Sequence, residues 1–280
     1  MIHPRENAAR EVGLFAGLWL ILLLPFGWLD ARLQEAISPG LVLPWGLAVL
    51  LAALAAAWLL LRREERGLET MGLPLEGAPA LRGMGGGLLA GVALTLPAGL
   101  FVGLPGVGSY ELLPAGADRV LVEGGRLFLL LSVPAAAEEL LFRGYPLALL
   151  MEGLGAKWGV GLTSGLFGLL HLANPGLTPL AVVNLFLAGV VLALLVIRTG
   201  SLWWAVGAHL GWNWSTWWIL GQPVSGLPAG EAPLFSFTAQ GPGWLSGGAF
   251  GLEGSLAVTV LLLGSGVALY MRGGQWRPSP

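Results

Sequence analysis

The chain contains no cysteine and few charged residues, and both absences narrow the classes of protein that it can belong to. Only 11% of its 280 residues are charged, whereas soluble domains carry about 25%. The absence of cysteine excludes disulfides, thiol catalysis and cysteine-ligated zinc or iron–sulfur centres. The net charge is −2 and no basic run is present, so we expect no nucleic-acid partner. This composition excludes an ordinary soluble domain.

Hydrophobic residues dominate what is present. They make up 55% of the chain, and the mean hydropathy is +0.77. Many lie in runs of about 20 residues, the length needed to cross a bilayer as a helix. We therefore predict an all-α polytopic membrane protein with about eight transmembrane helices, forming one domain over residues 1–280. The predicted spans are Val12–Leu29, Leu41–Leu61, Gly83–Leu104, Val120–Met151, Trp158–Leu172, Pro179–Ile197, Leu202–Leu220 and Leu252–Met271.

Positively charged residues are unevenly divided between the loops that these spans create. Ten fall on one side of the membrane: Arg5, Arg10, Arg62, Arg63, Arg66, Arg82, Lys157, Arg198, Arg272 and Arg277. Arg32 and Arg119 fall on the other. Because cytoplasmic loops are enriched in Lys and Arg, we predict that both termini are cytosolic. We expect the protein to lie in the plasma membrane of a prokaryote. The polar loop Gly221–Gly251 is expected on the outer face, as a capping or re-entrant segment.

Three short strings place polar side chains inside these hydrophobic runs: AAAEELLFRG, FGLLH and HLGWN. The polar residues are Glu138, Glu139, Arg143, His171, His209 and Asn213. An ionisable group at membrane depth costs about 2.5–3.5 kcal/mol even on lenient scales, and such groups are usually functional. The strings therefore indicate a functional site within the membrane.

Helix geometry separates the roles of the two adjacent glutamates. Glu139 and Arg143 are four residues apart, so they share a helix face and can form an ion pair. Glu138 is rotated by about 100° from Glu139 and points elsewhere, which leaves its carboxylate available for chemistry. A purely structural salt bridge near a helix end is the alternative, but it would leave the second glutamate without a partner.

The two histidines follow the same spacing rule. Phe167 and His171 are four apart, as are His209 and Asn213, so each histidine projects with a companion from its own helix. A single histidine in a membrane helix often serves only as an interhelical hydrogen-bonding group. Two histidines together with a glutamate pair, in successive helices, indicate catalysis instead.

The stretch Val120–Met151 is longer than one crossing requires. Pro134 and Gly144–Pro146 are expected to kink or break it, and its last part, LALLM, could form a separate helix. We favour a continuous helix, because it places Glu138 and His171 at similar depths, roughly 20 and 21 Å from the cytosolic boundary. A helix that ended at Arg143 would leave Glu138 only about 7 Å deep.

These residue types fit hydrolysis of a peptide bond by activated water. A carboxylate near an imidazole can take a proton from water, which then attacks a carbonyl. A second histidine and an asparagine on one face can donate hydrogen bonds to the developing oxyanion. No serine lies in a Gly-x-Ser-x-Gly setting, so the pattern favours a mechanism without a covalent intermediate.

The three strings, in this order and spacing, resemble the motifs of the CPBP family, which comprises CAAX proteases and bacteriocin-processing enzymes and is also called Abi. Its motifs E-E-x-x-x-R, F-x-x-x-H and H-x-x-x-N match this chain within roughly Val120–Leu220. The resemblance implies an intramembrane endopeptidase related to the type II CAAX prenyl proteases. Its substrate would be a membrane-associated or lipidated protein.

The resemblance also implies a role for each matching residue. Glu138 and His171 would activate water, and His209 and Asn213 would form the oxyanion hole. The supporting residues would be Glu139, Arg143 and Phe167.

Two alternatives stay open. A zinc-dependent protease could use Glu138, His171 and His209 as ligands, since two histidines and a carboxylate form a known catalytic zinc set. No H-E-x-x-H motif is present, and we favour a mechanism without a metal cofactor. A non-catalytic immunity protein or a transporter could share the fold, although a transporter would predict repeats and matched broken helices, which the sequence lacks.

Overall fold

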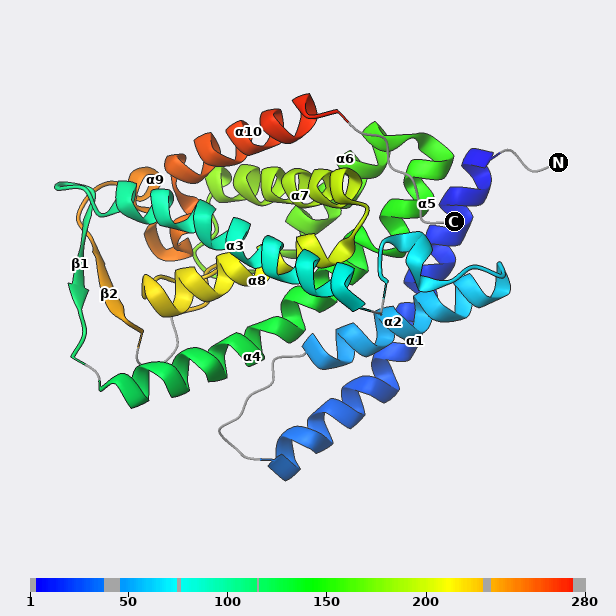
Figure 1. Cartoon of the computed structure of the whole chain (residues 1–280), viewed down its shortest axis with the longest axis horizontal. Coiled ribbons are helices and arrows are strands. Elements are labelled where there is room, and N and C mark those ends of the chain that lie inside the picture. Colours follow the sequence, from blue (N-terminus) through cyan, green and yellow to red (C-terminus); the bar gives the residue numbers. More distant parts are fainter. Residues whose placement is uncertain (1–3, 38–45, 75–76, 115, 229–232, 274–280) are drawn as a thin grey trace.

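The computed structural model describes residues 4–37, 46–74, 77–114, 116–228 and 233–273. The α-helices in chain order are α1 (Pro4–Ile37), α2 (Gly46–Arg63), α3 (Gly77–Val102), α4 (Ala117–Arg143), α5 (Tyr145–Leu154), α6 (Ala156–Leu170), α7 (Pro179–Thr199), α8 (Leu202–Trp214), α9 (Gly243–Ser246) and α10 (Leu256–Met271). Short helical turns are η1 (Leu68–Met71), η2 (Ser215–Ile219, a π-helix), η3 (Gly248–Phe250) and η4 (Leu252–Gly254). Figure 1 shows long helices lying side by side, with a two-stranded sheet at one end. The predicted all-α architecture is confirmed.

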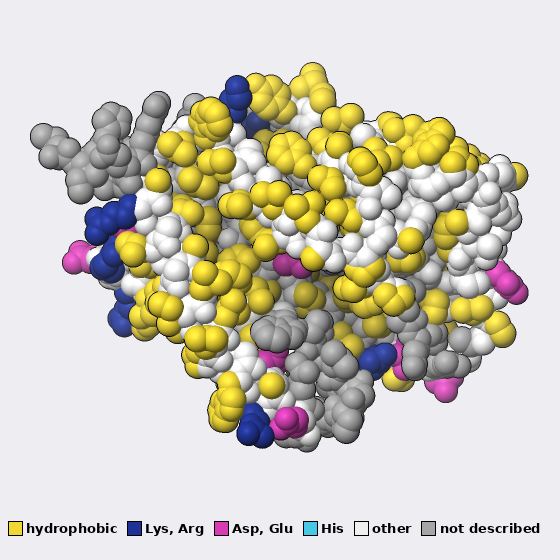
Figure 2. Space-filling view, turned by 180° about the vertical axis from the view of Figure 1, so that it is seen from behind, with side chains coloured by type: hydrophobic (Ala, Val, Ile, Leu, Met, Phe, Trp, Pro, Cys, Tyr) yellow, Lys and Arg dark blue, Asp and Glu magenta, His cyan; other side chains and the backbone are white. Residues whose placement is uncertain are grey.

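Hydrophobic length and surface character both fit a bilayer. Among the described residues, five helical stretches are long and apolar enough to cross it: Ala8–Leu33, Gly46–Arg63, Gly77–Val102, Val120–Leu154 and Pro179–Thr199. The other three predicted spans correspond to the apolar helices α6, α8 and α10, which have 15, 13 and 16 residues. Hydrophobic side chains cover most of the face in Figure 2, and Leu24 and Leu100 are 77% and 75% exposed. Such a surface suits lipid, and the protein is an integral membrane protein.

Some sequence predictions lie outside the described residues. These are the predicted start of the second span at Leu41, the C-terminal Arg277, and residues 229–232 of the predicted outer loop. The eight crossings and the cytosolic location of the termini stay predictions.

The preference for a continuous helix over Val120–Met151 is wrong. The helix runs through Pro134, but α4 ends at Arg143 and α5 begins at Tyr145. Between them Gly144 has φ −77° and ψ −122°, which is not helical. Pro146 lies in the first turn of α5, where its missing N–H removes no helical hydrogen bond. In a continuous helix the same ring would clash with the preceding turn. Glu138 therefore lies near the end of α4.

Helices α3 and α8 approach each other so closely that their backbones touch. A Cβ atom on Gly91 of α3 would lie 2.1 Å from the carbonyl oxygen of Ala208, and one on Gly207 of α8 would lie 2.3 Å from that of Met84. Only glycine fits such positions, as expected for small-residue packing between membrane helices. We call this contact the glycine seam. It fixes α8, the helix that carries His209 and Asn213.

The loops at one end of the bundle form a compact cap. Strand β1 (Gly108–Leu112) pairs antiparallel with β2 (Phe235–Ala239), from Gly108 opposite Ala239 to Leu112 opposite Phe235. The pairing, which the sequence did not predict, is visible at the left of Figure 1. At Gly226, where φ is +80°, a Cβ atom would lie 2.0 Å from the carbonyl oxygen of Pro175. The loop after η2 thus packs directly against the α6–α7 linker.

Candidate active site

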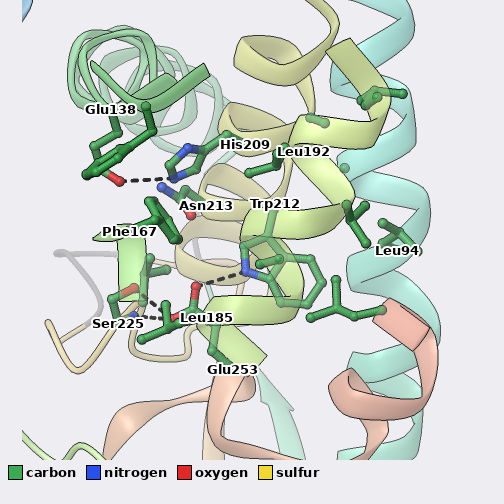
Figure 3. A pocket seen from close by; sticks show the side chains of 18 of the residues that line it. Leu94, Glu138, Phe167, Leu185, Leu192, His209, Trp212, Asn213, Ser225 and Glu253 are labelled. Atoms are coloured by element: carbon green, nitrogen blue, oxygen red, sulfur yellow. Dashed lines mark hydrogen bonds and ion pairs between the residues drawn. The ribbon is translucent and has the colours of Figure 1, made fainter. Parts of the chain in front are cut away.

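A cavity of about 880 Å³ lies inside the helical bundle. Most of its lining is hydrophobic and comes from α3, α4, α6, α7, α8 and α10. The four residues predicted to be catalytic all line it: Glu138, His171, His209 and Asn213. The fold therefore brings together side chains from three separate helical regions in one apolar chamber (Figure 3).

A buried chain of charged groups links α4 to α8. The Arg143 Nη1 atom donates a hydrogen bond of 3.0 Å to Glu139 Oε1, the ion pair predicted from their spacing. The same oxygen accepts a 2.8 Å bond from His209 Nδ1. Both side chains of the ion pair are 0% exposed, and each compensates the buried charge of the other. Because Glu139 holds Nδ1 of His209, the opposite nitrogen, Nε2, is directed toward Glu138.

Glu138 differs from its neighbour in both exposure and partners. Its side chain is 32% exposed, and its Oε2 lies 3.8 Å from His209 Nε2. That oxygen is buried and has no hydrogen-bond partner among the described residues. An unsatisfied buried polar atom calls for an explanation, and a catalytic role is one. Glu139 Oε2 also lacks a partner among the described residues, so exposure is what distinguishes the two glutamates most clearly. Glu138 is therefore a carboxylate with spare accepting capacity, facing the cavity.

His171 caps the end of α6. Its Nδ1 lies 2.7 Å from the carbonyl oxygen of Phe167, and a carbonyl oxygen can only accept. The proton of the neutral imidazole is therefore assigned to Nδ1, which makes Nε2 the accepting nitrogen. This tautomer gives His171 a basic nitrogen for chemistry in the cavity.

Phe167 is the packing centre of the site. The Arg143 Cζ atom lies 4.4 Å from the centroid of its ring. The rings of His171 and His209 have their centroids 4.7 and 6.1 Å from that of Phe167. The aromatic face offsets part of the cost of the buried cation, and the ring keeps the two imidazoles apart. These contacts explain why a phenylalanine accompanies the histidine in the second motif.

Asn213 lies one turn beyond His209 on α8. Figure 3 shows its amide beside the His209 ring, and both residues line the cavity. A π-helical turn, η2, follows directly at Ser215, and such turns are frequent at functional sites. Asn213 and His209 thus present an amide and an imidazole from one helix face.

Sequence reasoning missed a second polar group in the same cavity. Glu253 of η4 accepts a 3.2 Å bond from Trp212 Nε1 and a 2.9 Å bond from Ser225 Oγ. Glu253, Trp212 and Ser225 all line the cavity. A signal was available, because Glu253 is a carboxylate at the start of the predicted span Leu252–Met271, where ionisable groups are costly.

The arrangement of His, Asp and Glu side chains tests the alternative prediction of a zinc site. Within the described ranges, no three His, Asp or Glu side chains are arranged to hold a metal ion. Glu138, His171 and His209 share the cavity but do not converge as a ligand set. No chemical step is therefore assigned to a metal below.

Comparisons with known proteins agree with these observations. Residues 124–215 match the family model described as Type II CAAX prenyl endopeptidase Rce1-like. An uncharacterized protein of Bacillus subtilis (strain 168), YyaK, is 30% identical over 170 residues, covering 58% of this chain and 52% of that protein. The chain thus spans about half the length of this curated relative. No solved structure matches.

The matched segment contains all three motifs and ends two residues after Asn213. It begins in α4 and takes in α5, α6, α7 and α8, which are the helices that surround the polar end of the cavity. The family model that matches residues 124–215 is of the family that the motifs resemble, the type II CAAX prenyl endopeptidases.

Proposed function

We propose that this chain is an intramembrane endopeptidase that hydrolyses a peptide bond of a membrane-associated or lipidated protein. One observation carries the proposal. Glu138 faces the cavity 3.8 Å from His209, whereas its neighbour Glu139 is fully buried and paired with Arg143. One carboxylate is thus committed to holding the site together, and the other has capacity to accept a proton.

In the proposed reaction, water loses a proton to Glu138, with His171 Nε2 orienting it, and its oxygen attacks the peptide carbonyl carbon. General-base assistance of this kind contributes about 10²–10⁴-fold to a rate. The carbonyl oxygen becomes an oxyanion, which accepts hydrogen bonds from the Asn213 amide and from protonated Nε2 of His209. When the C–N bond breaks, Glu138 returns its proton to the leaving amine. Arg143 and Glu139 keep the His209 ring fixed throughout.

The apolar lining of the cavity supports a substrate that enters from the membrane. A polar peptide would lose its hydration there without gaining partners along most of the wall. A hydrophobic segment or a lipid-modified peptide would instead gain from burial. This favours lipidated or membrane-embedded protein substrates.

The first test compares cleavage by the wild type and the Glu138→Gln variant, using purified full-length protein in vesicles and membrane peptides as probes. We expect a loss of activity of about 10²–10⁴-fold, with unchanged thermal unfolding, and similar losses for His171→Ala and His209→Ala. The control is Glu123→Gln on the same helix, where the glutamate pairs with Arg126 at the surface. Full activity of Glu138→Gln contradicts the mechanism, and an inactive wild type supports the non-catalytic alternative.

A second test separates the mechanism without a metal from the zinc-dependent alternative. The purified protein is assayed with a strong chelator, and its zinc content is measured by elemental analysis. We expect activity to survive chelation and zinc to be substoichiometric. Sustained loss of activity that added zinc restores would establish the zinc-dependent mechanism instead.

A further inference from the structure

Glu253 lies outside the segment that matches the protease family, so the match assigns it no role. It belongs to η4 (Leu252–Gly254), between the outer cap and α10. Its carboxylate faces the same cavity as Glu138. Figure 3 shows the two glutamates at opposite ends of the drawn part of the pocket, with Phe167 and Asn213 between them.

Neutral groups alone hold this carboxylate. Its Oε1 accepts from Trp212 Nε1, and its Oε2 accepts from both the backbone N–H and the hydroxyl of Ser225. Ser225 has φ +49°, a left-handed conformation that is unfavourable for a residue with a side chain. Backbone strain of this kind tends to occur at functional sites. Three hydrogen bonds from neutral donors thus orient the carboxylate.

The charge balance of Glu253 differs from that of the other buried glutamate. Glu139 has the guanidinium of Arg143 at 3.0 Å. In the described part of the chain, Glu253 forms no ion pair with any Lys or Arg. A carboxylate in an apolar cavity is costly unless a cation compensates it or a proton neutralises it.

In the described part of the chain, His171 forms no ion pair with Glu253. It is close enough to interact electrostatically with Glu253, but its Nδ1–H is already bonded to the Phe167 carbonyl. Glu253 therefore cannot be the group that orients the imidazole through Nδ1. The carboxylate faces whatever enters the cavity beside His171.

We propose that Glu253 determines specificity by binding a cationic side chain, lysine or arginine, close to the scissile bond of the substrate. The proposal rests on the protease function proposed above. A cationic side chain would form a charge-assisted hydrogen bond with the carboxylate, which is stronger than a bond between neutral groups. Its aliphatic stem would lie along the apolar wall while its charged end reaches Glu253. The substrate backbone would then lie beside His171.

The alternative is that Glu253 only holds Ser225 and Trp212 in place. The two roles make different predictions for paired substrates. A structural role changes the rate for every substrate by the same factor. A specificity role changes the ratio of rates between cationic and neutral substrates.

The test uses hydrophobic membrane peptides in vesicles, synthesised in pairs that differ only by lysine or norleucine at one position, for three positions on each side of the cleavage point. Mass spectrometry reads the products. The wild type should prefer the lysine peptide by about tenfold or more at one position, which corresponds to about 1.4 kcal/mol. In Glu253→Gln the ratio should fall to about one, because the glutamine is neutral.

Matched variants separate charge from architecture. Ser225→Ala removes one hydrogen bond but leaves the carboxylate, so both rates should fall while their ratio is kept. Glu253→Asp keeps the charge and should retain a preference for lysine. Equal cleavage of both peptides by the wild type overturns the specificity proposal but leaves the protease function standing. Cleavage of neither peptide overturns both proposals.

Discussion

At the end of the cavity formed by α4 and α8, Glu139 is neutralised by a cation one turn away on its own helix. At the end formed by η4 and the cap, Glu253 is held by three neutral donors, of which the Ser225 hydroxyl and the Trp212 ring come from different elements. We call these the helical end and the loop end. The helical end carries fixed machinery with its own countercharge. The loop end presents a carboxylate that forms no ion pair with any described Lys, Arg or His side chain.

The strongest test of this contrast removes the internal cation of the helical end. Arg143→Met leaves Glu139 buried at 0% exposure without its partner, and breaking a buried ion pair in this way costs about 3–5 kcal/mol. We expect the free energy of unfolding, measured by denaturant titration in detergent, to fall by that amount. The double variant with Glu139→Gln should recover part of it.

A surface pair on the same helix provides the control for this prediction. Arg126 and Glu123 are 36% and 25% exposed at the side chain, and exposed pairs contribute about 0–1 kcal/mol. Arg126→Met should therefore change stability little. If both variants lost the same free energy of unfolding, burial would not explain the importance of the Glu139–Arg143 ion pair.

A second test alters the glycine seam that supports the helical end. In Gly91→Ala the new Cβ atom would lie 2.1 Å from a backbone oxygen of α8, so the helices must separate, at a cost of about 1–3 kcal/mol. The rate of cleavage should also fall, because α8 carries His209. Gly85→Ala is the matched control, since nothing lies within 4 Å of its Cβ position. A stable and active Gly91→Ala protein would contradict the assigned rigidity.

A third test loosens the loop end. Asn184 of α7 is 1% exposed, and its Nδ2 donates to the backbone oxygens of Glu253 and Ser255 at 2.7 and 2.9 Å. Asn184→Leu leaves these acceptors unsatisfied, which costs about 1–3 kcal/mol. Stability should fall. The rate of cleavage of lysine peptides should fall further than the rate for neutral peptides, so the preference for lysine should decrease. Thr259→Val, which removes only the hydroxyl that donates to Asn184, should have the smaller effect.

The smallest expected effect concerns the backbone of Ser225. Both Ser225→Ala and Ser225→Gly lose the hydroxyl bond to Glu253, but glycine adopts φ +49° without the cost of about 1–2 kcal/mol that alanine incurs. The glycine variant should therefore be the more stable of the two by about 1 kcal/mol, as measured by thermal unfolding. The reverse order would show that the strain at Ser225 has no energetic significance.

The helical end could be predicted from the sequence because a helix converts spacing into shared faces. The four-residue separation of Glu139 and Arg143 sufficed to predict their ion pair. The helix boundary was harder, because Pro134 is accommodated within α4 whereas Gly144 ends it. From the local sequence, Pro134 and Gly144 are both plausible helix breakers. Only the packing around them decides which one ends the helix.

The loop end could not be predicted because its contacts join distant segments. The Asn174 side chain bonds the carbonyl of Ser225, 51 residues away, and β1 pairs with a strand that lies more than 120 residues later. No periodicity encodes such pairings. In the sequence, Glu253 is an isolated acidic residue beside a hydrophobic run. No nearby residue indicates its partner or its role.

The glycine seam limits which wall of the cavity can change shape. Side chains can change rotamer to relieve a clash, but a contact between two backbones cannot. Helix α8 therefore has little room to shift relative to α3. Leu262 and Leu269 of α10 line the same cavity, and their side chains can change in size. Substitutions in α10 would therefore change the shape of the cavity without disturbing the contact between α3 and α8.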